Sequence, residues 1–205
     1  MPSKRALLFL NGKIKNFSKI KKIINKTDLL IGVDGGTKHI LKLGLKPNYI
    51  IGDLDSYTPK NKTIPVIKYP TDKDFTDSEL AIKFVIEKKY REIIIFAFAG
   101  DRLDHMISNL MIFAALPANI VIYTDKQEFY FVKNKLEIIG QKNDLISLIP
   151  LFTDCQNVTT SNLKFPLNDE TLTIKEGRGI SNVMLSSKAT VSLKSGTLLL
   201  VKTTT

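Results

Sequence analysis

Two hydrophobic patterns alternate along the first part of the chain. Short apolar runs end at glycine, proline or charged residues, which predicts β-strands. Between them, apolar residues recur every three or four positions, which predicts amphipathic helices. The predicted strands are 6–10, 29–33, 49–51, 66–69, 92–98 and 119–123, and the predicted helices are 17–24, 37–43, 77–89 and 101–115. The alternation predicts an α/β N-terminal domain with a mainly parallel sheet flanked by helices.

Capping residues locate several of the predicted helix ends. Ser18 is a possible N-cap of the first helix, and Gly44 is expected to close the second. Thr76 and Glu79 have the spacing of a capping box, so the third helix should begin directly after Thr76.

The hydrophobic pattern changes near residue 127. From residue 129 onward the apolar runs are short and rich in Thr, Val and Leu, turn residues separate them, and helical periodicity disappears. This pattern is typical of an all-β sandwich or barrel. We therefore expect two domains, 1–127 and 128–205, the second an all-β sandwich.

Composition narrows the class of protein. The chain has 205 residues, of which 43% are hydrophobic, as expected for a globular protein. No apolar run approaches the roughly 20 residues of a membrane helix. The run at 6–10 is too short for a signal-peptide core, so we expect a cytoplasmic protein that does not associate with membranes. The single cysteine, Cys155, is expected to be a core residue.

The net charge of +10 allows two interpretations. A basic surface attracts nucleic acid or a small polyanion. The 30 Lys and Arg residues are scattered, however, and no basic motif is interleaved with aromatic residues. A lysine-rich surface is therefore the simpler interpretation, and we do not expect a nucleic-acid partner.

Carboxylates follow the predicted strands of the N-terminal domain. Ligands of parallel α/β sheets bind at the carboxyl ends of the strands. Polar residues follow the second to fourth strands and the long strand at 92–98, and the set consists of Asp34; Asp53 and Asp55; Asp72, Asp74 and Asp77; and Arg102, Asp104 and His105. Clustered carboxylates repel one another, so the set predicts a counter-charge at this edge.

Mg²⁺ is the counter-ion that oxygen ligands favour, and it commonly bridges carboxylates to substrate phosphates. Asp53 and Asp55 lie two residues apart and would share a face in extended backbone. Asp77 opens a helix, where backbone N–H groups could bind phosphate. Arg102 offers a planar fork for phosphate oxygens. Together these residues predict metal-assisted phosphoryl-type transfer.

Each acidic residue also has a structural interpretation, because Asp at a strand–helix junction is often a cap or turn former. We interpret Asp72 and Asp101 in this way. The two histidines, His39 and His105, predict neither a histidine metal site nor a catalytic triad. The sequence contains neither a P-loop nor a GxGxxG fingerprint.

The motifs, in this order, resemble those of the thiamine pyrophosphokinase family. In the first domain the resemblance rests on Asp-Gly-Gly at 34–36, Gly-Asp-Leu-Asp-Ser at 52–56, Lys-Asp-Phe-Thr-Asp at 73–77 and Arg-Leu-Asp-His at 102–105. In the second it rests on segments 148–151, 162–167, 181–182 and 191–199. The resemblance implies transfer of the pyrophosphoryl group of ATP to the thiamine hydroxyl, which gives thiamine diphosphate and AMP. It also implies a homodimer whose active site joins the α/β domain of one subunit to the sandwich of the other.

The resemblance also implies roles for individual residues. Metal ligands would be Asp53, Asp55 and Asp77, and the catalytic set would add Asp74 and Arg102. The ATP-binding residues would be Asp34, Gly35, Lys73, Thr76 and Arg102. The thiamine-binding residues would be Asp104, Ser181 and Asn182.

The chain departs from the family pattern in two places. Gly100-Asp101 stands where the family has two glycines before the arginine, and an earlier turn glycine is replaced within 97–99. A side chain in such a turn is expected to bar left-handed backbone and alter the approach of phosphate. Gly179 stands where the family often has serine two places before Ser181.

Two alternative functions remain open from the sequence. A related pyrophosphokinase could act on another alcohol, such as a hydroxymethyl pterin, with the same carboxylate turns and a different sandwich pocket. A basic protein without enzymatic activity could instead bind nucleic acid through its lysines, with strong salt dependence.

Overall fold

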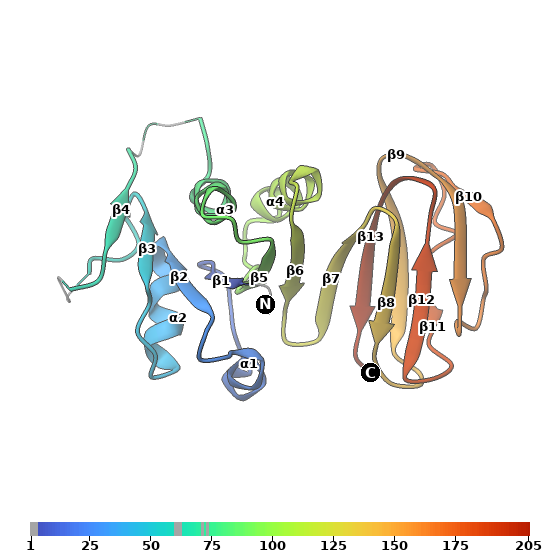
Figure 1. The fold of residues 1–205 in the computed structure, drawn as a ribbon, viewed down its shortest axis with the longest axis horizontal. Helices are drawn as coiled ribbons and strands as arrows, with labels where there is room; N and C mark the ends of the chain where they lie inside the picture. The colour runs from blue at the N-terminus through green and yellow to red at the C-terminus, as the bar shows by residue number, and fades with distance from the viewer. Residues whose placement is uncertain (1–3, 60–62, 71, 73) are drawn as a thin grey trace. The chain divides into compact units, whose positions relative to one another are not determined.

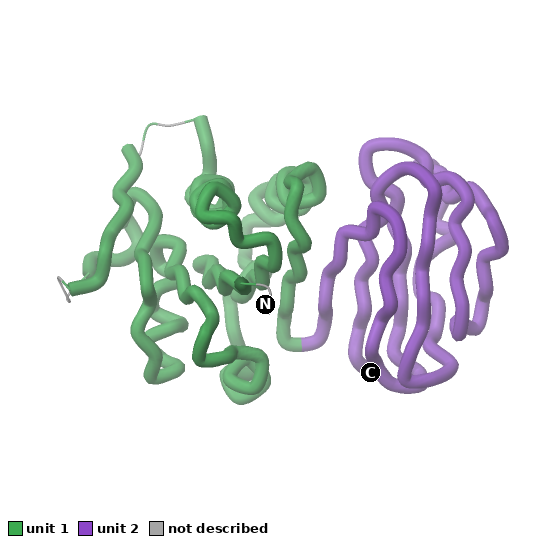
Figure 2. Tube along the Cα trace, viewed as in Figure 1, with its two compact units in different colours: residues 1–125 green, residues 126–205 purple. Residues whose placement is uncertain are grey.

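The computed structural model describes residues 4–59, 63–70, 72 and 74–205. The chain divides into two compact units, residues 1–125 and 126–205 (Figure 2). The boundary predicted from the change in pattern, residue 127, is the first residue of β7 (Gln127–Val132), a strand of the second unit.

A parallel sheet forms the centre of the first unit (Figure 1). Its strands lie in the order β4-β3-β2-β1-β5-β6, and each neighbouring pair is parallel. The strands are β1 (Arg5–Phe9), β2 (Leu29–Val33), β3 (Tyr49–Gly52), β4 (Val66–Lys68), β5 (Glu92–Phe96) and β6 (Asn119–Tyr123). The chain adds strands on one side of β1 up to β4 and then on the other side from β5, so the order reverses between β1 and β5.

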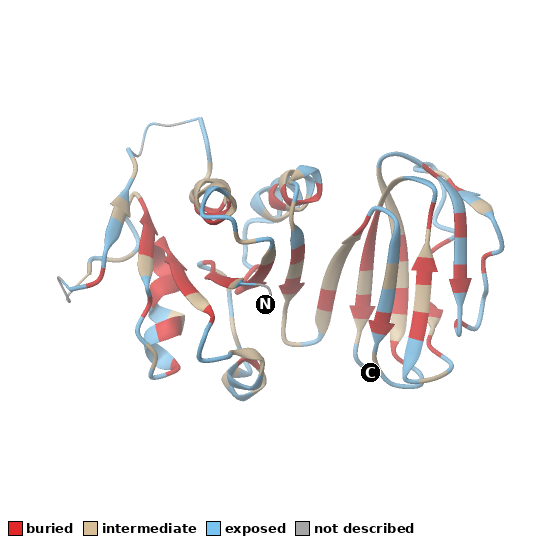
Figure 3. Ribbon diagram, viewed as in Figure 1, coloured by how far each residue is buried: buried red, intermediate tan, exposed pale blue. Residues whose placement is uncertain are grey.

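Helices cover both faces of this sheet. In Figure 1, α1 (Phe17–Ile23) and α2 (Thr37–Lys42) lie on one face, and α3 (Asp77–Glu87) and α4 (Leu103–Ala115) lie on the other. The inner strands β1, β2, β3 and β5 are mostly buried, whereas the edge strand β4 and the outer sides of the helices are largely exposed (Figure 3). Phe9 and Phe96 pack against Ile20 of α1 and Ile40 of α2 in one hydrophobic cluster. The broad prediction of a sheet with flanking helices is therefore confirmed.

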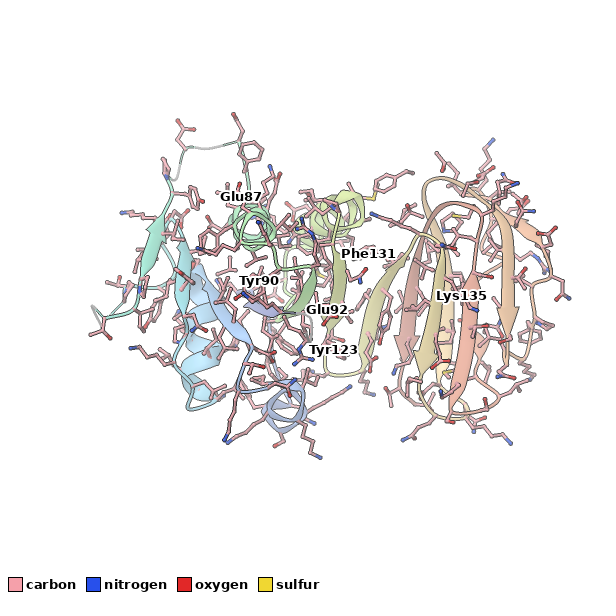
Figure 4. The ribbon with its side chains drawn as sticks, in the orientation of Figure 1. Glu87, Tyr90, Glu92, Tyr123, Phe131 and Lys135 are labelled. Atoms are coloured by element: carbon pink, nitrogen blue, oxygen red, sulfur yellow. The ribbon has the colours of Figure 1, made fainter. Side chains whose placement is uncertain are left out.

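Charged residues occupy the amino ends of these strands. Arg5 donates to both carboxylate oxygens of Asp28, at 3.0 and 2.7 Å. Glu92, the first residue of β5, pairs in register with Arg5 and is labelled in Figure 4. The hydrogen bond that Arg5 donates to Asp28 is the main reason that the pKa of Arg5 is raised. The amino ends of the strands thus carry the Arg5–Asp28 ion pair, and the carboxyl ends carry the carboxylate turns.

Several predicted element ends are corrected by local hydrogen bonds. Ser18 is not the cap of α1, because Asn16 is the N-cap and its side chain accepts from Lys19 N at 3.0 Å. The strand expected at 92–98 ends at Phe96, since Ala97 turns into the left-handed region with φ 55°. The helix expected from residue 101 begins at Leu103.

Two other helix ends agree with the sequence. Gly44 lies just beyond α2 with φ 75° and donates from its N–H to Leu41 O. Thr76 is the N-cap of α3, and its Oγ1 accepts from Glu79 N at 3.2 Å. These caps confirm the predicted end of α2 and start of α3.

The second unit contains antiparallel strand pairs. Its longest strand, β9 (Leu145–Ser161), pairs with four others. The main order is β7-β13-β9-β12-β8, and two shorter strands pair with β9 outside that order. The remaining strands are β8 (Lys135–Ile139), β10 (Glu170–Leu172), β11 (Asn182–Val183), β12 (Lys188–Ser192) and β13 (Ser195–Thr203).

Cys155 lies in the hydrophobic core of this unit and is completely buried. Burial is the main cause that raises the pKa of its thiol, so the thiolate is disfavoured. Its predicted place in the core is confirmed. Among the helices of the described residues, none has the length and apolar character needed to cross a bilayer.

Candidate active site

A cleft of about 560 Å³ opens at the carboxyl ends of the strands in the first unit. Its lining includes residues that follow β1, β2, β3 and β5 and residues from the first turns of α3 and α4. The segments after β1 and β5, 10–12 and 97–102, both contribute, so the cleft lies where the strand order reverses. Open α/β sheets bind their ligands at this position.

The cleft brings together five of the residues expected at the site. They are Asp34, Asp53, Thr76, Asp77 and Arg102. Asp55, Asp74, Gly35 and Asp104 are not among the residues that line it. Lys73 lies outside the described residues.

Asp34 is held by a tight turn that only small residues permit. It has φ 46° and begins the short 3-10 helix η1 (Asp34–Gly36). A Cβ on Gly35 would lie 2.2 Å from Asn11 Oδ1, and one on Gly36 would lie 1.8 Å from Phe9 O. The two glycines therefore allow this turn to pack against the end of β1, and Gly35 contacts the cleft residue Asn11.

The turn after β3 links Asp53 to Asp34. Asp53 Oδ1 accepts from Asp55 N at 3.1 Å, while Asp34 Oδ1 accepts from Ser56 N at 3.3 Å. Leu54 has φ 71°, so Asp53 and Asp55 are not successive residues of an extended strand. The expectation that these two side chains share a face because of extended backbone is wrong, since the chain turns at Leu54. Asp55 is exposed.

Arg102 and Asp104 form a bidentate ion pair at the start of α4. Arg102 Nε donates to Oδ1 at 2.9 Å and Nη2 to Oδ2 at 2.6 Å. Both side chains are largely exposed. The hydrogen bonds that Arg102 donates to Asp104 hold the pKa of Asp104 well below its usual range and raise the pKa of Arg102. The guanidinium fork expected to meet phosphate is thus engaged by a neighbouring carboxylate.

The turn after β5 differs from the expectation based on its sequence. Ala97 adopts φ 55° despite its Cβ, so the prediction that a side chain bars left-handed backbone there is wrong. Such a conformation is strained for alanine but is accessible. Ala97 O accepts from Gly12 N at 2.9 Å, which ties the turn to the end of β1. Asp101 lines the cleft and forms a 2.6 Å ion pair with Lys13.

In the second unit, Asn182 is fully engaged with backbone. Asn182 Oδ1 accepts from Phe165 N at 3.0 Å, and its Nδ2 donates to Phe165 O at 2.6 Å. Ser181 is exposed, has φ 57° and donates from its N–H to Ser147 Oγ. Asn182 therefore fixes the backbone at Phe165, a residue that is 60% exposed.

Gly179 is explained by its surroundings. A Cβ there would lie 2.3 Å from Leu148 O, so a serine does not fit without movement of the strand. Gly179 O accepts from Leu148 N at 2.9 Å, which holds the two segments together. The departure from the family pattern thus accompanies a close backbone contact.

Several residues that line the cleft were not predicted from the sequence. These are Asn11, Ser78, Met106 and Asn109, whereas His105 and Ser56, which also line it, lie in the predicted turns. Asn11 follows β1 as Asp34 follows β2, so the same strand-end rule would have found it. His105 and Asn109 lie four residues apart on α4, a spacing that places both on one helical face.

The carboxylates of the cleft suit a hard divalent cation. Asp34, Asp53 and Asp77 offer only oxygen donors, as Mg²⁺ prefers. Among the described residues, no group of three or more Asp, Glu, His or Cys side chains forms a ready-made metal cage. Mg²⁺ usually binds through one or two carboxylates with water and substrate phosphates, so this arrangement fits such a metal.

Two family models match the chain. "Thiamin pyrophosphokinase, catalytic domain" matches residues 20–124, and "Thiamin pyrophosphokinase, vitamin B1 binding domain" matches residues 133–198. A thiamine pyrophosphokinase of Bacillus subtilis (strain 168) is 34% identical over 187 residues, which cover 86% of this chain and 87% of the relative.

Solved structures show the same fold. A crystal structure of thiamine pyrophosphokinase from Bacillus subtilis superposes with a TM-score of 0.89 at 26% identity, and covers 98% of this chain and 100% of its own. The yeast thiamin pyrophosphokinase superposes with a TM-score of 0.80 at 17% identity, over 99% of this chain and 87% of its own. With both family models matched in order along most of its length, the chain belongs to the thiamin pyrophosphokinase family.

Proposed function

We propose roles for individual residues of this chain in the reaction of its family. The chain is an ATP-dependent diphosphotransferase that converts thiamine and ATP into thiamine diphosphate and AMP. The thiamine hydroxyl oxygen bonds to the β-phosphorus of ATP. The bond from that phosphorus to the oxygen bridging to the α-phosphorus breaks, AMP leaves, and the hydroxyl proton is released. A pterin alcohol as substrate is not favoured, because the second family model is a vitamin B1 binding domain.

The observation that carries the proposal is the cleft at the reversal between β1 and β5. Asp53 and Asp77 line it and would hold Mg²⁺, and Asp34, which also lines it, would contact ATP. When bound, the metal would neutralise charge on the phosphates of ATP. Asp55 and Asp74 do not line the cleft. They are included in the proposed metal and catalytic set because they belong to the family motifs.

The remaining proposed contacts to ATP surround the same cleft. Thr76 and the first N–H groups of α3 face a position suited to phosphate, because a helix N-terminus favours anions. Arg102 would exchange one or both bonds to Asp104 for phosphate oxygens, and both residues are exposed enough to move. Gly35, which has no side chain, would allow ATP to approach the backbone closely beside Asn11. The proposed contact by Lys73 rests on the family motif alone.

We propose that the second unit is a sandwich that binds thiamine and forms the dimer. Ser181 and Asn182 are the proposed thiamine contacts there, and Asp104 is proposed to join them. The side-chain amide of Asn182 hydrogen-bonds to the backbone N–H and C=O of Phe165. Asn182 would therefore contribute to thiamine binding by holding the exposed Phe165 in place. An aromatic ring in that position offers a flat apolar face to a heteroaromatic ligand.

The location proposed for the protein is the cytoplasm. This proposal rests on the thiamine pyrophosphokinase relatives of the chain. The apolar run at residues 6–9 forms β1 between β2 and β5 and is completely buried in the core of the first unit.

Substitution of the carboxylates tests the metal assignment. We expect Asp53→Asn and Asp77→Asn to lower kcat/KM by about 100-fold or more while the free energy of unfolding changes little, since metal-bridged charge stabilisation is lost. The measurement is AMP formation during a Mg²⁺ titration. Asp28→Asn, at the amino ends of the strands, is the control for a change in stability that does not involve the cleft. Normal turnover by both cleft variants would show that the metal assignment is wrong.

A further inference from the structure

A chain of hydrogen bonds joins the start of α3 to α4 inside the cleft. Thr76 Oγ1 lies 3.0 Å from Ser78 Oγ, and Ser78 Oγ donates to Asn109 Oδ1 at 2.8 Å. All three residues line the cleft, and Ser78 and Asn109 are buried. The chain therefore connects the N-cap of α3 to the second turn of α4.

The direction of this chain follows from the number of hydrogens. Ser78 has one hydroxyl hydrogen, which it donates to Asn109, so Thr76 must be the donor in the bond between Thr76 and Ser78. Thr76 Oγ1 in turn accepts from Glu79 N at 3.2 Å. Each hydroxyl accepts one bond and donates the next. The chain begins at a backbone N–H and ends at the amide oxygen of Asn109.

This arrangement leaves the amide nitrogen of Asn109 for another partner. The residue is only 8% exposed and lines the cleft. Within the part of the chain that the structure describes, no residue accepts a hydrogen bond from its Nδ2, and this nitrogen is not among the fully buried side-chain atoms that lack a partner. A fixed donor with two hydrogens thus faces the cleft, since Ser78 holds the oxygen on the other side.

The neighbourhood favours an anionic oxygen as the acceptor. Asn109 lies beside the N-terminus of α3, an 11-residue helix whose first N–H groups and dipole attract negative charge. The amide of Asn109 is neutral, so it can donate to a phosphate oxygen without changing the net charge of the cleft. A cationic ligand such as thiamine would gain little from a neutral donor at a helix N-terminus.

We propose that Asn109 binds the transferred diphosphoryl group of ATP, through a hydrogen bond from Nδ2 to a phosphate oxygen. Thr76 and Ser78 orient the amide through the directed chain of hydroxyls. Asn109 is then a catalytic residue for the reaction of this family, and Ser78 is a positioning residue that acts through it.

Asn109→Asp keeps an oxygen for Ser78 but replaces the amide donor by a negative charge, and Asn109→Ala removes the donor without adding charge, so the decisive result is a loss of affinity in both variants. We expect the affinity for α,β-methylene-ATP in the presence of Mg²⁺ to fall about tenfold to 100-fold, the range for a hydrogen bond to a charged group. The affinity for AMP, which lacks the transferred group, should stay within about twofold of the original. Isothermal calorimetry measures both values without relying on turnover.

Ser78→Ala tests the orienting role. The amide of Asn109 keeps its donor but loses its anchor, so we expect a smaller decrease, about threefold to tenfold, in α,β-methylene-ATP affinity. Ser78→Thr keeps the hydroxyl and should restore most of that affinity. Failure of Ser78→Thr to bind more tightly than Ser78→Ala would contradict the orienting role.

Asn48→Asp is the matched control. Asn48 Oδ1 accepts from Leu30 N at 2.7 Å, at the amino ends of the strands. The substitution makes the same chemical change as Asn109→Asp, but away from the cleft. Its nucleotide affinity should remain that of the original protein. The proposal is overturned if Asn109→Asp or Asn109→Ala binds α,β-methylene-ATP normally, if AMP affinity falls equally, or if only the KM for thiamine rises.

Discussion

Ala97 shows how a single residue can hold a turn that glycine would adopt more easily. Its φ of 55° bends the chain directly after β5 and points its carbonyl at Gly12. A Cβ on Gly12 would lie 2.3 Å from that carbonyl oxygen, so the contact depends on glycine at position 12. The strain is therefore located at Ala97, and the close contact is located at Gly12.

Replacement of Ala97 by glycine should stabilise the fold. We expect Ala97→Gly to raise the free energy of unfolding by about 0.5–1 kcal/mol, because relief of the left-handed strain exceeds the added entropy of the unfolded chain. Denaturant unfolding measures the change. Ala99→Gly is the control: Ala99 has no positive φ, so that substitution should lower stability. Equal effects of the two substitutions would contradict the role of strain.

His39 gives the fold a dependence on pH. Burial lowers the pKa of its imidazole below the ordinary value, and its Nε2 lies 2.9 Å from Gly12 O. The unfolded chain therefore binds a proton more readily than the folded one. Stability should be fully present above the unfolded pKa of about 6.5 and should decrease as the pH falls from there toward the lowered folded pKa.

Replacement of His39 tests that dependence. In His39→Gln the decrease in the free energy of unfolding between about pH 6.5 and 5 should be smaller than in the original protein. Urea unfolding at several pH values measures it. An unchanged slope in the variant would assign the pH dependence to other groups.

At the scale of elements, close backbone contacts decide where side chains fit. A Cβ on Gly179 would lie 2.3 Å from Leu148 O. A Cβ on Gly177 would instead have Ile180 Cγ1 as its nearest neighbour, at 3.9 Å. The two glycines lie in the same segment but have very different space. The family serine cannot be restored at position 179 without moving β9.

Paired serine substitutions test this difference. Gly179→Ser should lower the free energy of unfolding by about 1–3 kcal/mol, as expected for overpacking. Gly177→Ser should change it by less than about 0.5 kcal/mol, because the site is exposed and open. Thermal unfolding of both variants provides the comparison. A stable Gly179→Ser variant would show that the contact with Leu148 is easily relaxed.

Strands and helices of the first unit were predictable because their periodicity is local. The capping pattern at Thr76 located the start of α3 correctly, since the Thr76 side chain bonds within its own turn. The predicted N-cap of α1, Ser18, was wrong, because Asn16 and Ser18 are both good caps and only the folded backbone selects Asn16. Tertiary contacts decided what the local pattern left open.

The candidate site was predictable in outline for a similar reason. Strand-end carboxylates such as Asp34 and Asp53 meet in one cleft because parallel strands share a carboxyl edge. The pairing of Arg102 with Asp104 and the bond from Ser78 to Asn109 were not predictable. The first depends on side-chain rotamers, and the second joins residues 31 positions apart.

For the whole molecule, the proposed homodimer makes a prediction about mixed subunits. If each site joins the first unit of one subunit to the second unit of its partner, two inactive variants should complement each other. Equal amounts of Asp77→Asn and Asn182→Ala that exchange subunits should recover about a quarter of full activity, because half of the dimers are mixed and each has one intact site.

Sedimentation measures the dimer, and AMP formation before and after mixing measures complementation. Each variant mixed with itself is the control and should remain inactive. A dimer without recovery would indicate that each subunit builds its site alone, and a monomer that turns over normally would contradict the proposed dimer.

The most direct test of the central claim is the product balance with thiamine, ATP and Mg²⁺. AMP and thiamine diphosphate should form in equal amounts, and product formation should be abolished by removal of the divalent cation and strongly reduced in Asp77→Asn. Release of ADP, turnover of a hydroxymethyl pterin in place of thiamine, or full activity of Asp77→Asn would contradict the claim.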